Sequence, residues 1–420
     1  MHQPLIWYGR RIVSNLEKML SSKDDRERND AKLMIRAYKN PAKYVKLLKE
    51  EGYEPKIMLD FSGILLESLK EMNKKISRLI VGGEKIGNII KLYREVLRKY
   101  PESMEFAGTA YSHCYFPVTP EEDWEYQIEE WRKTFSKLFG KKALERVKGF
   151  WLPEMGVPEE KKLEILIKLL KKFGYEWVFL PVEAVKGEKF MSFEERIKIT
   201  SQPHLIRAGN ESIVAIFKVK YDFIDQQAGC DAISVKRKCL QAWRIFKEIN
   251  NKPALVVPAS DGENGNVMMN EFFPQTFVPF FKRMIDKNIG SLTISEFLEK
   301  YYSSRGEIKV GSEVKVQPLG ASWRDGHEIW LGEARDFEIK RKIEELSKRF
   351  HEIEESLKEE MKEKEVRKIY EEAKKALLLA ETSCYVYWGV DFWFDQGERM
   401  IEFARGKIQE LERFKKKNLY

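Results

Sequence analysis

Residues 147–180 are VKGFWLPEMGVPEEKKLEILIKLLKKFGYEWVFL, and this stretch predicts the fold class. Two short apolar runs, 147–152 and 177–180, flank a segment, 159–173, whose apolar residues recur at helical spacing. Strand, helix and strand in this order form the unit that builds parallel sheets. The stretch therefore indicates an α/β protein.

The same alternation continues on both sides of this stretch. Further short apolar runs lie at 56–59, 104–108, 213–219 and 254–258, and an amphipathic segment lies at 122–139. We therefore expect a parallel sheet with helical crossovers, either open or closed into a barrel.

The C-terminal part of the chain has a different composition. Residues 336–379 are almost free of Gly and Pro, and Ile339, Ile343, Leu346 and other apolar residues recur there at helical spacing. This pattern predicts one or two long amphipathic helices, with a further helix at 395–414.

Composition excludes several classes of protein. Of the 420 residues, 43% are hydrophobic and 12% aromatic, which is enough for a large core and excludes a disordered chain. The 75 basic and 67 acidic residues leave a net charge of only +8, and Lys alternates with Glu almost throughout. A nucleic-acid-binding protein concentrates its basic residues, so this pattern argues against nucleic acid. It favours a surface rich in ion pairs, which is typical of proteins from hot environments.

No membrane segment or secretory signal is recognisable. The most apolar region, 163–182, contains three lysines, and the first residues, MHQPLIWYGRR, lack the pattern of a signal peptide. The four cysteines (Cys114, Cys230, Cys239 and Cys384) form no CxxC pair. We expect reduced thiols and a cytoplasmic protein.

Polar residues follow three of the predicted strands. Glu154 follows 147–152, Asp261 follows 254–258, and His113 follows 104–108. The carboxyl ends of parallel strands meet at one edge of a sheet, so these side chains can converge. Taken alone, Glu154 could simply support the start of the next helix, and Asp261 with Gly262 could be only a turn. Together, two carboxylates across a cleft are what glycoside hydrolysis needs.

Aromatic residues strengthen the carbohydrate interpretation. Several of the ten tryptophans lie in segments broken by Gly or Asp, above all in SWRDGHEIWLGE at 322–333. Indole rings can stack on sugar rings, although burial in a core is the commoner role of a single Trp. The histidines show no metal-binding spacing, and His351, within the charged helix, is expected at the surface. No nucleotide-binding motif follows a strand.

Four short motifs together resemble those of glycoside hydrolase family 57, a family of α-glucan-active enzymes. They are HQP at 2–4, GTAYSH at 108–113, WLPE at 151–154 and DGENG at 261–265. With two later segments, ASWRDGHEIWLG and AETSCYVYWG, the resemblance covers nearly the whole chain. It implies an incomplete (β/α)7 barrel at 1–302 and a C-terminal helical domain at 303–420 that completes the active-site cleft. Only Met1 precedes HQP, so either the sequence starts late, which we favour, or the barrel lacks its first strand.

The resemblance also implies roles for individual residues. Glu154 would be the catalytic nucleophile and Asp261 the acid/base of a retaining hydrolase or transglycosidase. The expected substrate-binding residues are His2, His113, Trp151, Glu263, Trp323, Trp330 and Trp388. The substrate would be an α-glucan or maltooligosaccharide, and the mechanism needs neither a cofactor nor a metal.

Two alternatives from other classes remain open at this point. One is a metal-dependent polysaccharide deacetylase in which His2, His113 and Asp261 hold the metal. The other is a catalytically inactive homologue that binds glycans. Hydrolysis and transfer are equally compatible with the sequence.

Overall fold

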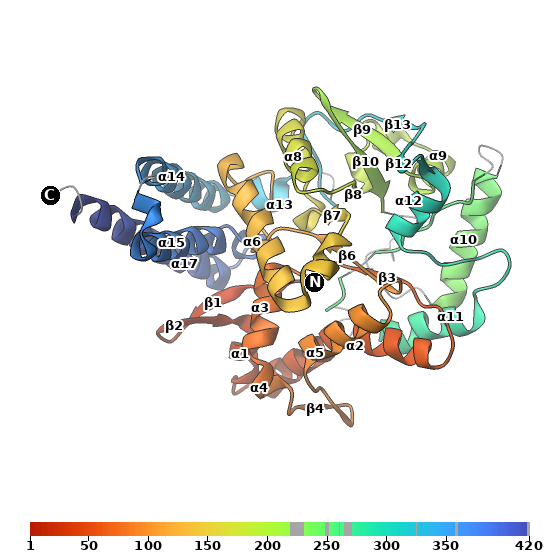
Figure 1. Ribbon diagram of the computed structural model, residues 1–420, viewed down its shortest axis with the longest axis horizontal. Helices are drawn as coiled ribbons and strands as arrows, with labels where there is room; N and C mark the ends of the chain where they lie inside the picture. The colour runs from red at the N-terminus through yellow and green to blue at the C-terminus, as the bar shows by residue number, and fades with distance from the viewer. Residues whose placement is uncertain are drawn as a thin grey trace.

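The computed structural model describes residues 1–218, 231–247, 252–259, 261–263, 271–324, 326–357 and 360–417. A central sheet is flanked by helices, and the C-terminal helices form a bundle at one side of the molecule, with the C-terminus at its far end (Figure 1). The helices are α1 Asn15–Leu20, α2 Asp25–Glu50, α3 Gly63–Glu71, α4 Asn73–Ile76, α5 Ile89–Lys99, α6 Glu121–Phe139, α7 Lys141–Glu145, α8 Glu160–Lys172, α9 Phe193–Thr200, α10 Ala232–Phe246, α11 Val278–Arg283, α12 Ile294–Tyr302, α13 Glu328–Leu331, α14 Ala334–Ser356, α15 Lys364–Ala380, α16 Cys384–Tyr387 and α17 Asp391–Lys417.

Within the described residues, seven strands form the central sheet, in the order β13-β9-β10-β8-β7-β6-β3. Five adjacent strands are parallel and keep their chain order across the sheet, although β9 comes between β8 and β10 along the chain. These are β3 Ile57–Leu59, β6 Met104–Gly108, β7 Gly149–Trp151, β8 Trp177–Leu180 and β10 Glu211–Phe217. The predicted α/β fold with a mainly parallel sheet is confirmed.

The end of the sheet beyond β10 differs from this pattern. β9 His204–Ala208 pairs antiparallel with β10, and β13 Glu313–Val314 pairs parallel with β9. Among the described residues, the two edge strands, β3 and β13, do not pair with each other. The sheet is therefore open in the part of the chain that the structure describes.

Some strands were not predicted, and one predicted strand is wrong. Three short hairpins were missed: β1 Leu5–Tyr8 with β2 Arg11–Ser14, β4 Ile80–Val81 with β5 Glu84–Lys85, and β11 Ser303–Ser304 with β12 Glu307–Ile308. Conversely, residues 253–259 were expected to contain a strand but join no ladder. Pro253 and Pro258 lack the N–H group that a ladder bond needs, which weakens this segment as a strand.

The helical part of the chain follows its amphipathic pattern. The predicted region contains two helices, α14 and α15, and the further helix is α17. The apolar stripe of α14 is buried, including Ile339 and Phe350. α6 contacts both β6 and α15, so it connects the sheet to the bundle (Figure 1).

The C-terminal segment does not separate from the sheet at residue 303. β13 belongs to the central sheet, and isolated bridges join Val316 to Val185 and Ala321 to Val157. Residues up to Ala321 therefore pack with the first part of the chain, and the helical bundle begins after them.

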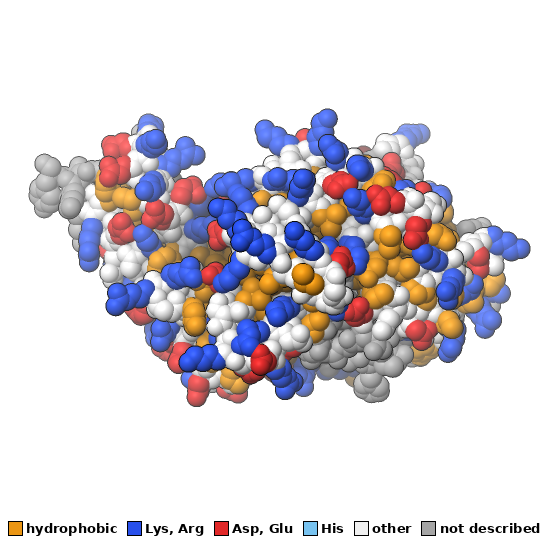
Figure 2. All heavy atoms as spheres, turned by 90° about the horizontal axis from the view of Figure 1, so that it is seen from below, with side chains coloured by type: hydrophobic (Ala, Val, Ile, Leu, Met, Phe, Trp, Pro, Cys, Tyr) orange, Lys and Arg blue, Asp and Glu red, His pale blue; other side chains and the backbone are white. Residues whose placement is uncertain are grey.

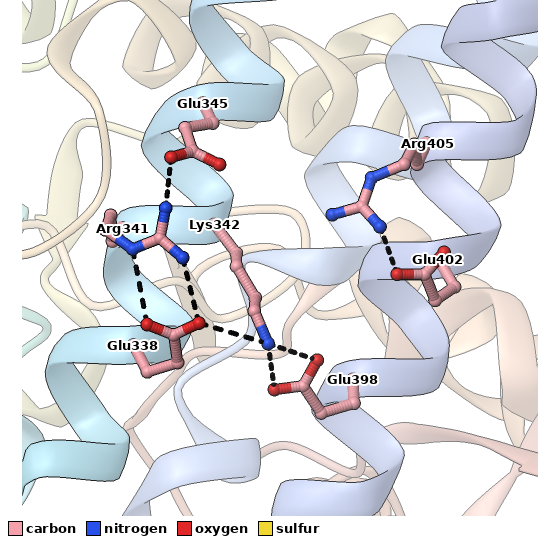
Figure 3. A network of polar contacts seen from close by, with 7 residues as sticks. All are labelled: Glu338, Arg341, Lys342, Glu345, Glu398, Glu402 and Arg405. Atoms are coloured by element: carbon pink, nitrogen blue, oxygen red, sulfur yellow. Dashed lines mark hydrogen bonds and ion pairs between the residues drawn. The ribbon is translucent and has the colours of Figure 1, made fainter.

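Ion pairs cover the bundle, as the alternation of Lys and Glu predicts. Lys342 on α14 lies 2.7 Å from Glu398 on α17, and Arg341 pairs with Glu338 at 2.9 Å and with Glu345 (Figure 3). A single exposed pair contributes only about 0–1 kcal/mol, so the Lys342–Glu398 pair is of interest chiefly because it joins two helices. Figure 2 shows acidic and basic side chains intermixed across the face seen from below. Within the described residues, no helix combines the length and apolar character needed to cross a bilayer.

Gly149 in β7 offers a test of packing beneath the site. A Cβ atom at this position would lie 2.1 Å from the ring of Trp177. That ring is fully buried, and its Nε1 donates a hydrogen bond to Ser295 Oγ at 3.0 Å, so it cannot move aside freely. We expect Gly149→Ala to lower the free energy of unfolding by about 1–3 kcal/mol, measured by guanidinium denaturation. Gly311→Ala, where no atom lies within 4 Å, is the control and should change stability little.

Candidate active site

Two predicted site residues have strained backbones. Glu154 follows β7 with φ 55° and ψ 19°, and His113 follows β6 with φ 62°. A non-glycine residue in this left-handed region costs about 1–3 kcal/mol and persists only where the surrounding structure determines it. Such strain is common at functional sites. The alternative role of Glu154 at the start of the next helix finds no support, because Glu159 occupies the N-cap position of α8.

The Glu154 carboxyl faces groups from two other parts of the chain. Trp323 Nε1 donates a hydrogen bond to Glu154 Oε2 at 3.2 Å. His113 Nδ1 lies 3.8 Å from Glu154 Oε1. Only 18% of the Glu154 side chain is exposed, enough for one edge of the carboxyl to meet a ligand.

Asp261 acts on Glu154 electrostatically. Burial, together with the negative charge of Asp261, raises the pKa of Glu154 to about 8, and Glu263 adds to the effect. Asp261 itself is exposed and lines a cavity of about 670 Å³ together with Trp151. The charge of a second carboxylate raises a pKa in this way only at short range. Asp261 and Glu263 therefore lie within electrostatic range of Glu154.

His2 and His113 form a stacked pair beside the carboxyls. Their ring centroids are 4.2 Å apart with an interplanar angle of 9°. His2 Nδ1 lies 2.8 Å from Ser62 Oγ, and His113 Nδ1 lies 3.1 Å from Ser383 Oγ. Burial lowers the pKa of His113 to about 3, and burial together with His113 lowers the pKa of His2 well below its usual value. Both rings are therefore neutral near pH 7 and can exchange hydrogen bonds with hydroxyl groups.

Glu263 lies behind this pair. Its Oε1 accepts a hydrogen bond from the His2 backbone N–H at 3.0 Å, and its Oε2 is buried without a donor among the described residues. Burial, followed by the charge of Asp261, raises the pKa of Glu263. The side chain thus anchors the segment that carries His2. The rest of the Asp-Gly-rich motif, including Asn264 and Gly265, lies outside the described residues.

The four predicted tryptophans have different environments. Trp151 stacks on Phe179 with centroids 5.1 Å apart and lines the cavity, and Trp323 contacts Glu154. Trp388 is 55% exposed and adjoins Tyr387. Trp330, in contrast, is only 2% exposed, and Tyr115 covers its ring at 3.9 Å. The prediction that Trp330 stacks on a sugar is therefore not supported, because its ring is buried against Tyr115.

Several contacts in the site were missed, and one prediction is wrong. Ser62 comes shortly after β3, so the strand-end rule that selected Glu154 would also have found it. Thr382 and Ser383 come from the helical region, and only the tertiary structure places them beside the histidines. His351 was expected at the surface, but only 23% of its side chain is exposed and it bonds to Asp123 and Glu354. The described cysteines, Cys114, Cys239 and Cys384, are free, while Cys230 lies outside the described residues.

Solved structures of several known proteins have a similar fold. The GH57-type branching enzyme from the hyperthermophilic archaeon Pyrococcus horikoshii has 18% sequence identity and a TM-score of 0.64, covering 90% of this chain and 83% of that one. The exo-type maltose-forming amylase from Pyrococcus sp. ST04 has 15% identity and a TM-score of 0.59, covering 98% and 67%. The 4-alpha-glucanotransferase from Thermococcus litoralis has 19% identity and a TM-score of 0.57, covering 89% and 56%. At these identities the likeness shows the fold alone.

No functionally curated protein sequence is significantly similar to the chain. The sequence profile of glycosyl hydrolase family 57 matches residues 1–311, which is most of the chain and includes all four motifs and the clustered carboxyls. The protein therefore belongs to glycosyl hydrolase family 57.

Proposed function

We propose that the protein is a retaining glycoside hydrolase or transglycosidase that acts on α-glucans. The observation that carries this proposal is the electrostatic coupling of Glu154 and Asp261 beside two neutral histidines. Family membership makes the chain a glycoside-hydrolase-type enzyme. Its structural relatives include a branching enzyme, a 4-alpha-glucanotransferase and an exo-type maltose-forming amylase, which supports an α-glucan as the substrate.

In the proposed mechanism, Glu154 attacks the anomeric carbon while Asp261 protonates the departing oxygen. Asp261 then removes a proton from water or from an acceptor hydroxyl, which releases the sugar from Glu154. This scheme requires the two carboxyls to lie about 5–5.5 Å apart across the bound sugar. His2 and His113 bond sugar hydroxyls, and Trp151, Trp323 and the exposed Trp388 supply ring surface. Glu263 supports His2.

The protonation of the carboxyl pair suits this chemistry. The raised pKa of Glu154 means that the ligand-free pair holds one proton near neutral pH, and a retaining mechanism needs one. In the ligand-free protein this proton resides on Glu154, a position that would suit an acid. The proposed roles require the proton to be on Asp261 when the bond breaks, with Trp323 Nε1 donating a hydrogen bond to the attacking Glu154 carboxylate. If Glu154 were instead the acid/base, the reaction of Glu154→Ala with azide and an α-glucosyl fluoride would give the α-glucosyl azide. The proposed roles predict the β-glucosyl azide.

The finer description of the fold also belongs to this proposal. We propose that residues 1–302 form an incomplete (β/α)7 barrel. Residues 303–420, whose first part packs on the sheet, would form the C-terminal domain that completes the active-site cleft. A cytoplasmic location and an origin in a hot environment remain predictions from the sequence. The proposed partner is an α-glucan, with no nucleic acid or membrane and no cofactor.

The metal-dependent deacetylase is not favoured. The described residues contain no group of three His, Cys, Asp or Glu side chains arranged to hold a metal ion. His2 and His113 stack face to face, and Ser62 and Ser383 already occupy one nitrogen of each ring. The other alternative, a catalytically inactive protein that binds glycans, differs from the proposed enzyme in forming no product, so product analysis distinguishes the two.

Product analysis tests the function. The purified protein would be incubated with maltoheptaose, and the products separated by chromatography, beside Glu154→Gln as the control. Shorter products alone indicate hydrolysis, and a ladder of shorter and longer products indicates transfer. Binding without any product in the parent protein would contradict the proposed activity and favour the inactive glycan-binding protein.

The pKa of Glu154 makes a prediction about pH. Above about pH 8 the ligand-free carboxyl pair loses its proton, so we expect kcat/KM to fall on the alkaline side with a midpoint near pH 8. Glu263→Gln removes a negative charge that raises this pKa, so the midpoint should move to lower pH by about 0.5–1 unit. Glu176→Gln, at the surface beside Lys148, is the control. A midpoint that stays in place or rises in Glu263→Gln would contradict the proposed coupling.

A further inference from the structure

A row of polar side chains leads from α14 inward to the histidine pair. His351 Nε2 lies 2.8 Å from Asp123 Oδ1, and Asp123, in the first turn of α6, is fully buried. Asp123 in turn lies beside Glu381, which is 4% exposed and directly follows α15. Two acids thus meet where the sheet region and the helical bundle join.

The two carboxyls need a proton between them. Asp123 Oδ2 and Glu381 Oε1 are both buried, and neither has a donor among the described residues. Two buried carboxylates would repel each other, whereas one proton, held by Glu381 and donated to Asp123, satisfies both oxygens. In agreement, burial and the charge of Asp123 raise the pKa of Glu381 well above its usual value.

Once Glu381 is protonated, one negative charge remains on Asp123, and His351 balances it. Burial opposes protonation of His351, but its hydrogen bonds to Asp123 and Glu354 prevail and raise its pKa to about 9. His351 is therefore a cation that faces the Asp123 carboxylate. The other titratable group beside Glu381 is the buried thiol of Cys114, whose pKa is raised by burial and by Glu381, so it stays neutral.

Glu381 is linked to the histidine pair in two ways, through Gln127 to the segment that carries His113 and through the residues that follow it in the chain. Its Oε2 accepts a hydrogen bond from Gln127 Nε2 at 2.6 Å, and Gln127 Oε1 accepts one from the backbone N–H of Ser112, which precedes His113. The two residues after Glu381 reach the same place. Thr382 Oγ1 lies 3.4 Å from His2 Nε2, and Ser383 contacts His113 through both its hydroxyl and its backbone N–H.

We propose that Glu381, holding a proton between Asp123 and Gln127, is a positioning residue that fixes Thr382 and Ser383 against the His2–His113 pair. The orientation of the two imidazoles then depends on a side chain that never touches the substrate. This inference depends on the proposed function only for its kinetic readout, because the arrangement of the rings can be observed without turnover.

The test compares two substitutions of one residue. In Glu381→Gln the introduced amide can donate to Asp123 and accept from Gln127, as the protonated acid does. Its imidazole signals, measured by ¹H–¹⁵N NMR of protein labelled at histidine, should match those of the parent, with KM for maltoheptaose unchanged within about twofold. Glu381→Ala leaves Asp123 and Gln127 without this partner. The His2 and His113 signals should shift, and KM should rise about tenfold with a smaller change in kcat.

Glu372→Gln, an identical change at a half-exposed position of α15 away from the histidines, is the control. Shifted imidazole signals in Glu381→Gln, or unchanged signals in a folded Glu381→Ala, would overturn the inference. If Glu381→Ala does not fold, Ser383→Ala replaces it and should shift the His113 signals while Glu381→Gln preserves them; unshifted His113 signals in Ser383→Ala would again overturn the inference. If the NMR signals behave as expected but the parent protein shows no turnover, the positioning role of Glu381 stands and only the proposed function is refuted.

Discussion

Glu154→Ala is expected to reduce turnover of maltooligosaccharides by a factor of about 10⁴ or more, because it removes the proposed nucleophile. Azide, which fits the space left by a carboxylate, should restore turnover of an α-glucosyl fluoride. It would attack the anomeric carbon from the face that Glu154 occupied and expel fluoride. The product should therefore be the β-glucosyl azide, identified by proton NMR.

The stereochemistry of this product decides the role of Glu154. An α-glucosyl azide would show that a covalent intermediate still forms in Glu154→Ala, which would make Glu154 the acid/base and exclude it as the nucleophile. Undiminished turnover in Glu154→Ala would show that Glu154 has no catalytic role. Glu160→Ala, at the exposed start of α8, is the matched control and should behave like the parent.

Asp261→Asn is expected to have an effect that depends on the leaving group. A departing sugar needs a proton, so kcat/KM for maltoheptaose should fall by a factor of about 10²–10⁴. Fluoride leaves without protonation, so an α-glucosyl fluoride should still form the covalent intermediate. Hydrolysis of that intermediate lacks its base, and a burst of fluoride should precede slow turnover, measured with a fluoride electrode.

Azide again provides the contrasting result. In Asp261→Asn it should intercept the intermediate and give the α-glucosyl azide, the opposite anomer to that expected from Glu154→Ala. Equal loss of activity on maltoheptaose and on the fluoride would contradict the acid/base role. Asp286→Asn, at an exposed position that pairs with Lys236, is the control.

Much of the fold was predictable because hydrophobic periodicity is a local property. The parallel strands β3, β6, β7 and β8 and the helices α6, α8 and α14 lie where the apolar runs and amphipathic stretches predict them. The segment 253–259 shows the limit of this method. Its apolar residues suit a strand, but a strand also requires a neighbouring partner with free N–H and C=O groups, which no local pattern reveals.

The candidate site was predictable to a similar extent. The carboxyl ends of parallel strands share one edge, so the order of strands and polar residues was sufficient to select Glu154 and His113. Asp261 was selected by the same rule, but the segment before it, 253–259, joins no ladder. Trp330 had the same sequence signal as Trp323, yet Tyr115 covers one ring while the other reaches Glu154. The exposure of an aromatic ring depends on which residues pack against it in the folded protein, and the adjacent residues in the sequence do not reveal these.

By itself, the sequence determined the α/β class, the amphipathic helices of the C-terminal part and the placement of Glu154 just after a strand. These depend on residue type and spacing over a few turns or one strand. Only the tertiary structure decided that His2 stacks on His113, that Ser383 reaches across from the helical bundle, and that Asp123 and Glu381 meet in the interior. The physical reason is that hydrogen bonds and pKa shifts at such distances are set by burial and by contacts between residues hundreds of positions apart.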